Sequence, residues 1–183
     1  VDLSYKDYLP LNFTGRNDWS STLPIDNNSY FYPSVSLAFV FSDAFDLTNS
    51  VFSYGKLRTS FAQVGNDTDP YQLSFNFFPI SSASGQYSLD VNFPFDGRLA
   101  FAKANTIPPE DLLPERQNSF EVGTELKFFD YKLGVDISYF STQNYDQILR
   151  LPIPQTTGFG FLRTNVGQVN TSGFEVAIDA TPI

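Results

Sequence analysis

The chain has 183 residues with 20 acidic and 11 basic side chains, and its net charge of −9 argues against a nucleic-acid-binding surface. Cys and His are both absent, which excludes disulfides and thiolate metal sites and removes the commonest general base. No run approaches the roughly 18 consecutive apolar residues of a membrane helix. The 20 Phe and 10 Tyr fit a membrane β-barrel and a carbohydrate-binding β-sandwich equally well.

The first third of the chain alternates apolar and polar residues, a period of two that is typical of β-strands. Strands are expected over residues 1–5, 9–19, 30–42 and 54–64. Pro10 has no N–H to donate, so a bulge or an unpaired position is expected there. The alternation is lost after the third strand, where Asp43 could cap a short helical turn.

Residues 65–117 follow the alternation only weakly and contain several prolines. Residues 72–78 and 86–95 within this segment could form a hairpin. A connection of this length is usually functional or an insertion, so we expect a long external loop region. Two readings stay open for it: contact with a substrate or partner, and simple cover for the mouth of a barrel.

The clearest pattern lies in residues 120–140, where Val122 and Leu126 alternate with Glu121 and Glu125. The short break at residues 129–132 predicts two antiparallel neighbours. A loop is expected over 145–159, followed by a last strand over 161–181 with bends at its glycines. In a barrel, the charged face of these strands would face the lumen. The predicted lumen-facing residues are Lys56, Arg58, Glu121, Glu125, Asp136, Glu175 and Asp179.

Short and long connections alternate along the chain, which places all the long ones at the same edge of an up-and-down sheet. This asymmetry is typical of outer-membrane barrels, which have short periplasmic turns and long external loops. The predicted fold is all-β, with antiparallel up-and-down strands forming part of a large transmembrane β-barrel. About seven strands are present, and because such barrels have even strand counts, residues 1–183 are expected to be a partial barrel domain, incomplete at both ends.

Several motifs resemble those of a known family. LLPER at 112–116 followed by EVGTE at 121–125, and NVG at 165–167 followed by GFE at 173–175, resemble strand signatures of TonB-dependent outer-membrane receptors. Three further stretches resemble the SusC/RagA branch: GRNDWSS at 15–21, YPSVS at 32–36, and KLR at 56–58 with GND at 65–67. The chain is similar to a segment from the second half of that barrel, without the family's plug domain.

The resemblance implies a transport function in the outer membrane of a Gram-negative, Bacteroidetes-like bacterium. It implies nutrient uptake by import of glycans or other oligomers such as peptides, energised by the TonB–ExbB–ExbD system through the absent plug. A SusD-like lipoprotein lid and membrane lipid are the implied partners, with no nucleic acid, no cofactor and no enzymatic activity. The alternatives are a soluble carbohydrate-binding β-sandwich and a cell-surface adhesin fragment.

Six residues near the long-loop edge are candidates for contact with a ligand or a lid: Trp19, Asp67, Asp69, Tyr71, Phe159 and Phe161. The aromatic rings could instead belong to the interfacial girdle of a barrel. Asn66 with the two aspartates offers oxygen ligands for Ca²⁺, but without the spacing of a calcium loop a turn before Pro70 is favoured. Glu121 and Glu125 would stand about 13 Å apart on one strand, too far for a glycosidase pair, so no catalytic residue is expected.

Overall fold

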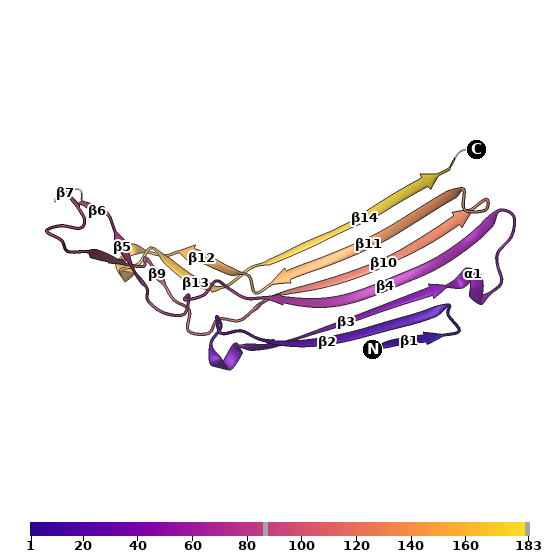
Figure 1. Ribbon diagram of the computed structural model, residues 1–183, viewed down its shortest axis with the longest axis horizontal. Coiled ribbons are helices and arrows are strands. Elements are labelled where there is room, and N and C mark those ends of the chain that lie inside the picture. The colour runs from indigo at the N-terminus through magenta and orange to yellow at the C-terminus, as the bar shows by residue number, and fades with distance from the viewer. Residues whose placement is uncertain (86–87, 182–183) are drawn as a thin grey trace.

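The computed structural model describes residues 1–85 and 88–181, and its main feature is a seven-stranded antiparallel sheet, here called the wall (Figure 1). In spatial order its strands are β1 (Asp2–Tyr5), β2 (Leu9–Trp19), β3 (Ser29–Val40), β4 (Phe52–Asn66), β10 (Glu115–Phe128), β11 (Leu133–Tyr145) and β14 (Gln168–Ala180). Figure 1 shows them side by side in one curved layer, with β1 at one edge and β14 at the other. The predicted antiparallel up-and-down fold and its seven strands are confirmed.

One end of the wall, the turn edge, carries only compact connections. Residues 6–8 join β1 to β2, and residues 129–132 join β10 to β11. Residues 41–51 join β3 to β4 and contain the short helix α1 (Phe41–Ala44). The prediction that Asp43 caps this helix is wrong, because the helix begins after Val40 and Asp43 lies inside its single turn.

The opposite end, the loop edge, carries three elaborate connections over residues 20–28, 67–114 and 146–167. They hold η1 (Ile25–Asn27), β5 (Phe77–Ile80), β6 (Ser82–Gly85), β7 (Ser88–Asn92), β8 (Ala100–Lys103), β9 (Thr106–Ile107), β12 (Ile148–Pro152), η2 (Gln155–Thr157) and β13 (Phe161–Asn165). The small strands pair as β12-β13-β9, β5-β8 and β6-β7, and Figure 1 shows them beyond the end of the wall rather than against its faces. The predicted split into a short-turn edge and a long-loop edge is confirmed.

Three local predictions are corrected. The predicted hairpin of residues 72–78 with 86–95 is wrong, because β5 pairs with β8, and the β6–β7 pair lies between them in the chain. Residues 86–87 of that prediction lie outside the described residues. A short alternating stretch shows that a strand forms but does not select its partner. The single strand over 161–181 is also wrong, since Gly167 adopts a φ of 85° and separates β13 from β14. The expected loop over 145–159 contains β12, which pairs with β13.

Pro10 stays in register opposite Ser4, so the expected bulge is wrong there. Phe13 N donates to Val1 O on the β1 side, so the N–H groups of even-numbered residues in β2 face β3. Pairing with β3 begins only at Leu11, although Val40 N still donates to Tyr8 O on the other side of Pro10. The missing N–H of Pro10 therefore leaves an unpaired position on the β3 side, as expected.

The wall has almost no protein core. Among the described residues, the buried hydrophobic side chains are Leu23, Tyr32 and Leu112, all near the loop edge. Large apolar side chains of the wall stay exposed, with 77% of Phe174 and 62% of Val176 accessible. The described residues form no second layer over this surface, as a β-sandwich would require. No helix among them is long and apolar enough to cross a membrane.

Candidate functional site

The polar face of the wall is organised around Arg58. In register, Arg58 of β4 lies opposite Gly123 of β10, which lies opposite Ser138 of β11. Because Gly123 has no side chain, the Arg58 guanidinium crosses above β10 and reaches Asp136. The two groups form a bidentate ion pair, in which Nη1 donates to Oδ2 at 2.6 Å and Nη2 donates to Oδ1 at 2.8 Å. A Cβ at Gly123 would lie 2.9 Å from Arg58 Cζ, so the glycine leaves room for the guanidinium to cross in this position.

Further ion pairs extend the bridge along the same face. Arg58 Nε lies 3.5 Å from Glu121 Oε1, and Glu125 lies 3.8 Å from Lys56 Nζ and 3.3 Å from Lys127 Nζ. The side chains in these pairs are between 27% and 46% exposed, which keeps them hydrated and makes each pair a weak contributor to stability. The structure thus brings together five of the predicted lumen-facing residues, Lys56, Arg58, Glu121, Glu125 and Asp136.

The other two predicted lumen-facing residues, Glu175 and Asp179, lie on β14. Register places them opposite Ser138 and Gly134, on the same face as Arg58. Among the described residues neither has a cation within 4.0 Å. That all seven face a lumen stays a prediction.

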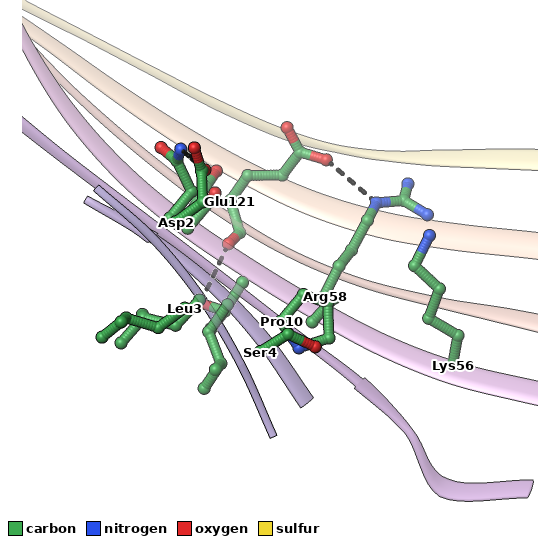
Figure 2. A pocket seen from close by; sticks show the side chains of 14 residues that line it. Asp2, Leu3, Ser4, Pro10, Lys56, Arg58 and Glu121 are labelled. Carbon is green, nitrogen blue, oxygen red and sulfur yellow. Dashed lines mark hydrogen bonds and ion pairs between the residues drawn. The ribbon is translucent and has the colours of Figure 1, made fainter. Parts of the chain in front are cut away.

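A hollow of about 490 Å³ opens on this polar face. It is lined from β1 to β4 and by Glu121 of β10, and in Figure 2 Lys56 and Arg58 extend from β4 toward the side that holds the Glu121 carboxylate. Its charged and hydroxyl groups offer hydrogen-bond donors and acceptors to a hydrated molecule. The hollow therefore presents a polar, hydrogen-bonding surface.

The other face of the wall is apolar over a limited height. Residues directly opposite one another in register share a face, so Leu57, Thr124, Ile137 and Val176 form one row across it. Toward the loop edge the face ends at a row of amide side chains, here called the amide row: Gln63, Asn118, Gln143 and Asn170. Strand geometry puts Asn118 about 33 Å from Phe128, or about 25 Å along the membrane normal for a 40° tilt.

The 112–116 motif closes the loop edge. Leu112 is fully buried, and the Asn165 side chain accepts from Leu113 N at 2.8 Å and donates to Leu113 O at 2.8 Å. Glu115 accepts from Ile148 N at 2.9 Å and from Asn66 Nδ2 at 3.1 Å. These contacts give the 112–116 and 165–167 motifs a common structural role. Both motifs attach the long connections to the loop edge of the wall.

Four of the predicted contact residues have different surroundings. Trp19 ends β2 on the apolar face and is 72% exposed, the position expected of a girdle residue. Asp67 accepts hydrogen bonds from Ser20 and Thr22 and joins two connections, whereas Tyr71 is 80% exposed. The described residues hold no group of three or more acidic side chains arranged around a metal position near Asp69. The role of all four as ligand contacts stays a prediction.

Phe159 and Phe161 each lie against a cation from another segment. The Phe159 ring stacks on Phe75 with centroids 5.5 Å apart, and Lys103 Nζ lies 4.2 Å and 4.3 Å from the two centroids. Arg150 Cζ lies 4.3 Å from the centre of the Phe161 ring. Sequence reasoning missed Phe75, Lys103 and Arg150, because the contacts join segments far apart in the chain and no local pattern marks them.

These features define a class of protein. A sheet with one charged, hydrated face, one uncovered apolar face and all long loops at one edge is a wall segment of a membrane β-barrel. Residues 1–181 match the family model described as TonB dependent receptor-like, beta-barrel, and the chain belongs to this family. The family consists of outer-membrane proteins of Gram-negative bacteria.

Relatives of the chain are receptors of the same family. TonB-dependent receptor P26 of Formosa agariphila is 27% identical over 188 residues, covering 100% of this chain and 18% of the relative. TonB-dependent receptor P39 of the same organism is 26% identical over 184 residues, covering 100% of this chain and 17% of the relative. The chain therefore spans less than a fifth of the length of these relatives, and their names denote receptors rather than enzymes.

Solved structures share the fold. The RagAB peptide transporter superimposes with a TM-score of 0.80 at 20% identity, covering 100% of this chain and 19% of that chain. The siderophore receptor PirA from Pseudomonas aeruginosa superimposes with a TM-score of 0.59 at 16% identity, covering 96% of this chain and 29% of that chain. At these identities the comparison supports the fold alone.

Proposed function

We propose that the chain forms part of the wall of an outer-membrane transporter that imports oligomeric nutrients, either glycans or peptides. The observation that carries this proposal is the uncovered apolar face of the wall. Exposed apolar side chains run across it from Leu3 and Phe13 to Val176 and Ile178, far more than a soluble monomer leaves in contact with water. Lipid is the medium in which such a face is stable.

The polar face supplies the complementary half of the proposal. In a closed barrel it would line a water-filled interior, with backbone groups paired between strands and charged side chains paired across them. The Arg58–Asp136 bridge and the Lys56–Glu125 pair balance charge along this path, leaving a polar surface that is neither strongly cationic nor strongly anionic near β4 and β10. This surface would admit hydrated solutes without repelling either sign of charge.

The loop edge would face the outside of the cell, and residues 65–117 would be an external loop region. We assign Asp67, Asp69, Tyr71, Phe159 and Phe161 to this side as candidate contacts with cargo or with a SusD-like lipoprotein lid. Energy would come from TonB–ExbB–ExbD acting through a plug contributed by other parts of the receptor. The chain itself carries out no bond chemistry in this proposal.

The test uses the full-length receptor that contains this chain. Cells expressing it, cells lacking it and cells lacking TonB are compared for uptake of fluorescent oligosaccharide and oligopeptide mixtures, with outer-membrane fractions probed for the receptor. The proposal expects receptor in that fraction and uptake that requires both receptor and TonB. Receptor in a soluble fraction, or uptake that persists without TonB, would contradict it.

A further inference from the structure

Cations of the wall and cations of the loop edge differ in their partners. Within the described part of the chain, the cations with a carboxylate within 4.0 Å all lie on wall strands: Arg16, Lys56, Arg58, Arg116 and Lys127. Lys103 of β8, Arg150 of β12 and Arg163 of β13 have none. In a chain with 20 acidic residues, this absence of partners does not come from a shortage of carboxylates.

Two of these cations occupy facing positions in one strand pair. Arg150 and Arg163 are directly opposite in the β12–β13 ladder, which puts their side chains on one face with Cβ atoms about 5 Å apart. Like charges in this arrangement destabilise a strand pair. The pair therefore has an electrostatic cost that a bound anion between the guanidinium groups would remove.

The surroundings orient both side chains but leave their charges unbalanced. Arg150 stacks over the Phe161 ring at 4.3 Å, and Arg163 Nη1 donates to Thr68 Oγ1 at 3.3 Å. Burial and the nearby Arg150 lower the pKa of Arg163, while Asp69 acts in the opposite direction from beyond ion-pair distance. Most of the N–H donors of the two guanidinium groups have no acceptor among the described residues.

We propose that the Arg150–Arg163 pair binds an oxyanion of the cargo, either a carboxylate or a sulfate ester. The planar guanidinium fork matches both groups and forms short, charge-assisted hydrogen bonds with them. This inference rests on the proposed import function and adds to it a selectivity for acidic oligomers over neutral ones.

The neighbouring aromatic side chains suit the rest of such a ligand. Gly160 N donates to Asn105 Oδ1 at 2.6 Å, and Phe161 N donates to Asn105 O at 3.2 Å, which attaches the β13 side to the segment that follows β8. The Phe75–Phe159 stack with Lys103 therefore lies on the chain segments that flank the arginine pair. Aromatic faces pack against sugar rings and apolar side chains, while the guanidinium groups bind the acidic group.

The test measures binding by calorimetry to the full-length receptor in detergent, separately from uptake. The probes are hexagalacturonate and its methyl ester, a sulfated carrageenan oligosaccharide and its desulfated form, and a glutamate-rich heptapeptide and its glutamine counterpart. Arg150→Gln and Arg163→Gln are compared with Arg98→Gln, which removes an exposed loop-edge cation outside the pair.

We expect the wild-type receptor to bind at least one acidic probe more tightly than its neutral counterpart. Arg150→Gln and Arg163→Gln should each weaken that probe about tenfold or more and leave the neutral form unchanged, because a hydrogen bond to a charged group is lost. Arg98→Gln should change neither. The probe that shows the effect identifies the source of the oxyanion, sugar carboxylate, sulfate ester or peptide.

Three results would overturn the inference: no acidic preference in the wild-type receptor, an unchanged preference in both arginine variants, or equal loss for acidic and neutral probes. Failure of the proposed function looks different. Tight, arginine-dependent binding of an acidic probe that cells never import would support the site and contradict the import function.

Discussion

Val176→Lys and Ala177→Lys place the same charge on opposite faces of one strand, and they test which medium each face contacts. Val176 lies opposite Ile137 in the apolar row, and Ala177 lies opposite Asp136 on the polar face. The two positions share a strand and nearly the same height. The depth and the new side chain are therefore matched between the two variants, and the higher strand propensity of Val than of Ala can account for at most about 1 kcal/mol of any difference.

The expected difference follows from depth. Val176 is six residues from Asn170 of the amide row, roughly 20 Å along the strand or about 15 Å along the membrane normal at a 40° tilt. That distance puts it near the middle of an apolar band about 25 Å tall, where a lysine on the lipid face costs about 2–4 kcal/mol. A lysine at position 177 would be hydrated beside the Asp136 carboxylate and should change stability by less than about 0.5 kcal/mol.

The measurement is the free energy of unfolding of the full-length receptor in lipid vesicles, from urea titrations followed by gel mobility. Ser172→Lys is a depth control, because it lies two residues from Asn170 and should cost only about 0–1 kcal/mol. Equal effects of the two main variants, or a larger loss for Ala177→Lys, would refute the assignment of the apolar face to lipid.

Three further outcomes are expected in the same receptor. Arg58→Gln and Asp136→Asn should show a coupling of about 1–2 kcal/mol in a double-mutant cycle of unfolding free energies, and additive effects would contradict the bidentate bridge. Gly123→Ala should reduce that coupling, since its Cβ would lie 2.9 Å from Arg58 Cζ and the guanidinium would have to shift; an unchanged coupling energy would show that Arg58 does not cross β10 there. Asn165→Ala should increase hydrogen exchange at Leu113 and in nearby loop-edge amides by about tenfold or more, whereas unchanged exchange would mean that the side chain does not hold the two connections together.

Much of the wall follows from sequence alone. The alternation in residues 120–140 predicts two strands and their antiparallel turn, and the structure forms β10 and β11 there in unbroken register. A period of two is a local property of the backbone, so it is readable wherever one face differs from the other. For the same reason Arg58, Glu121 and Asp136 could be assigned to one face before any contact was known.

The partners of these residues required tertiary structure. Register decides that Arg58 meets Gly123 and crosses to Asp136, two strands away and 78 residues along the chain. The same limit explains the incorrect hairpin in residues 72–95 and the division of the last strand at Gly167, where a short sequence pattern leaves the partner undefined. The opposed Arg150 and Arg163 are likewise invisible in sequence, because only the pairing of β12 with β13 brings the two charges together.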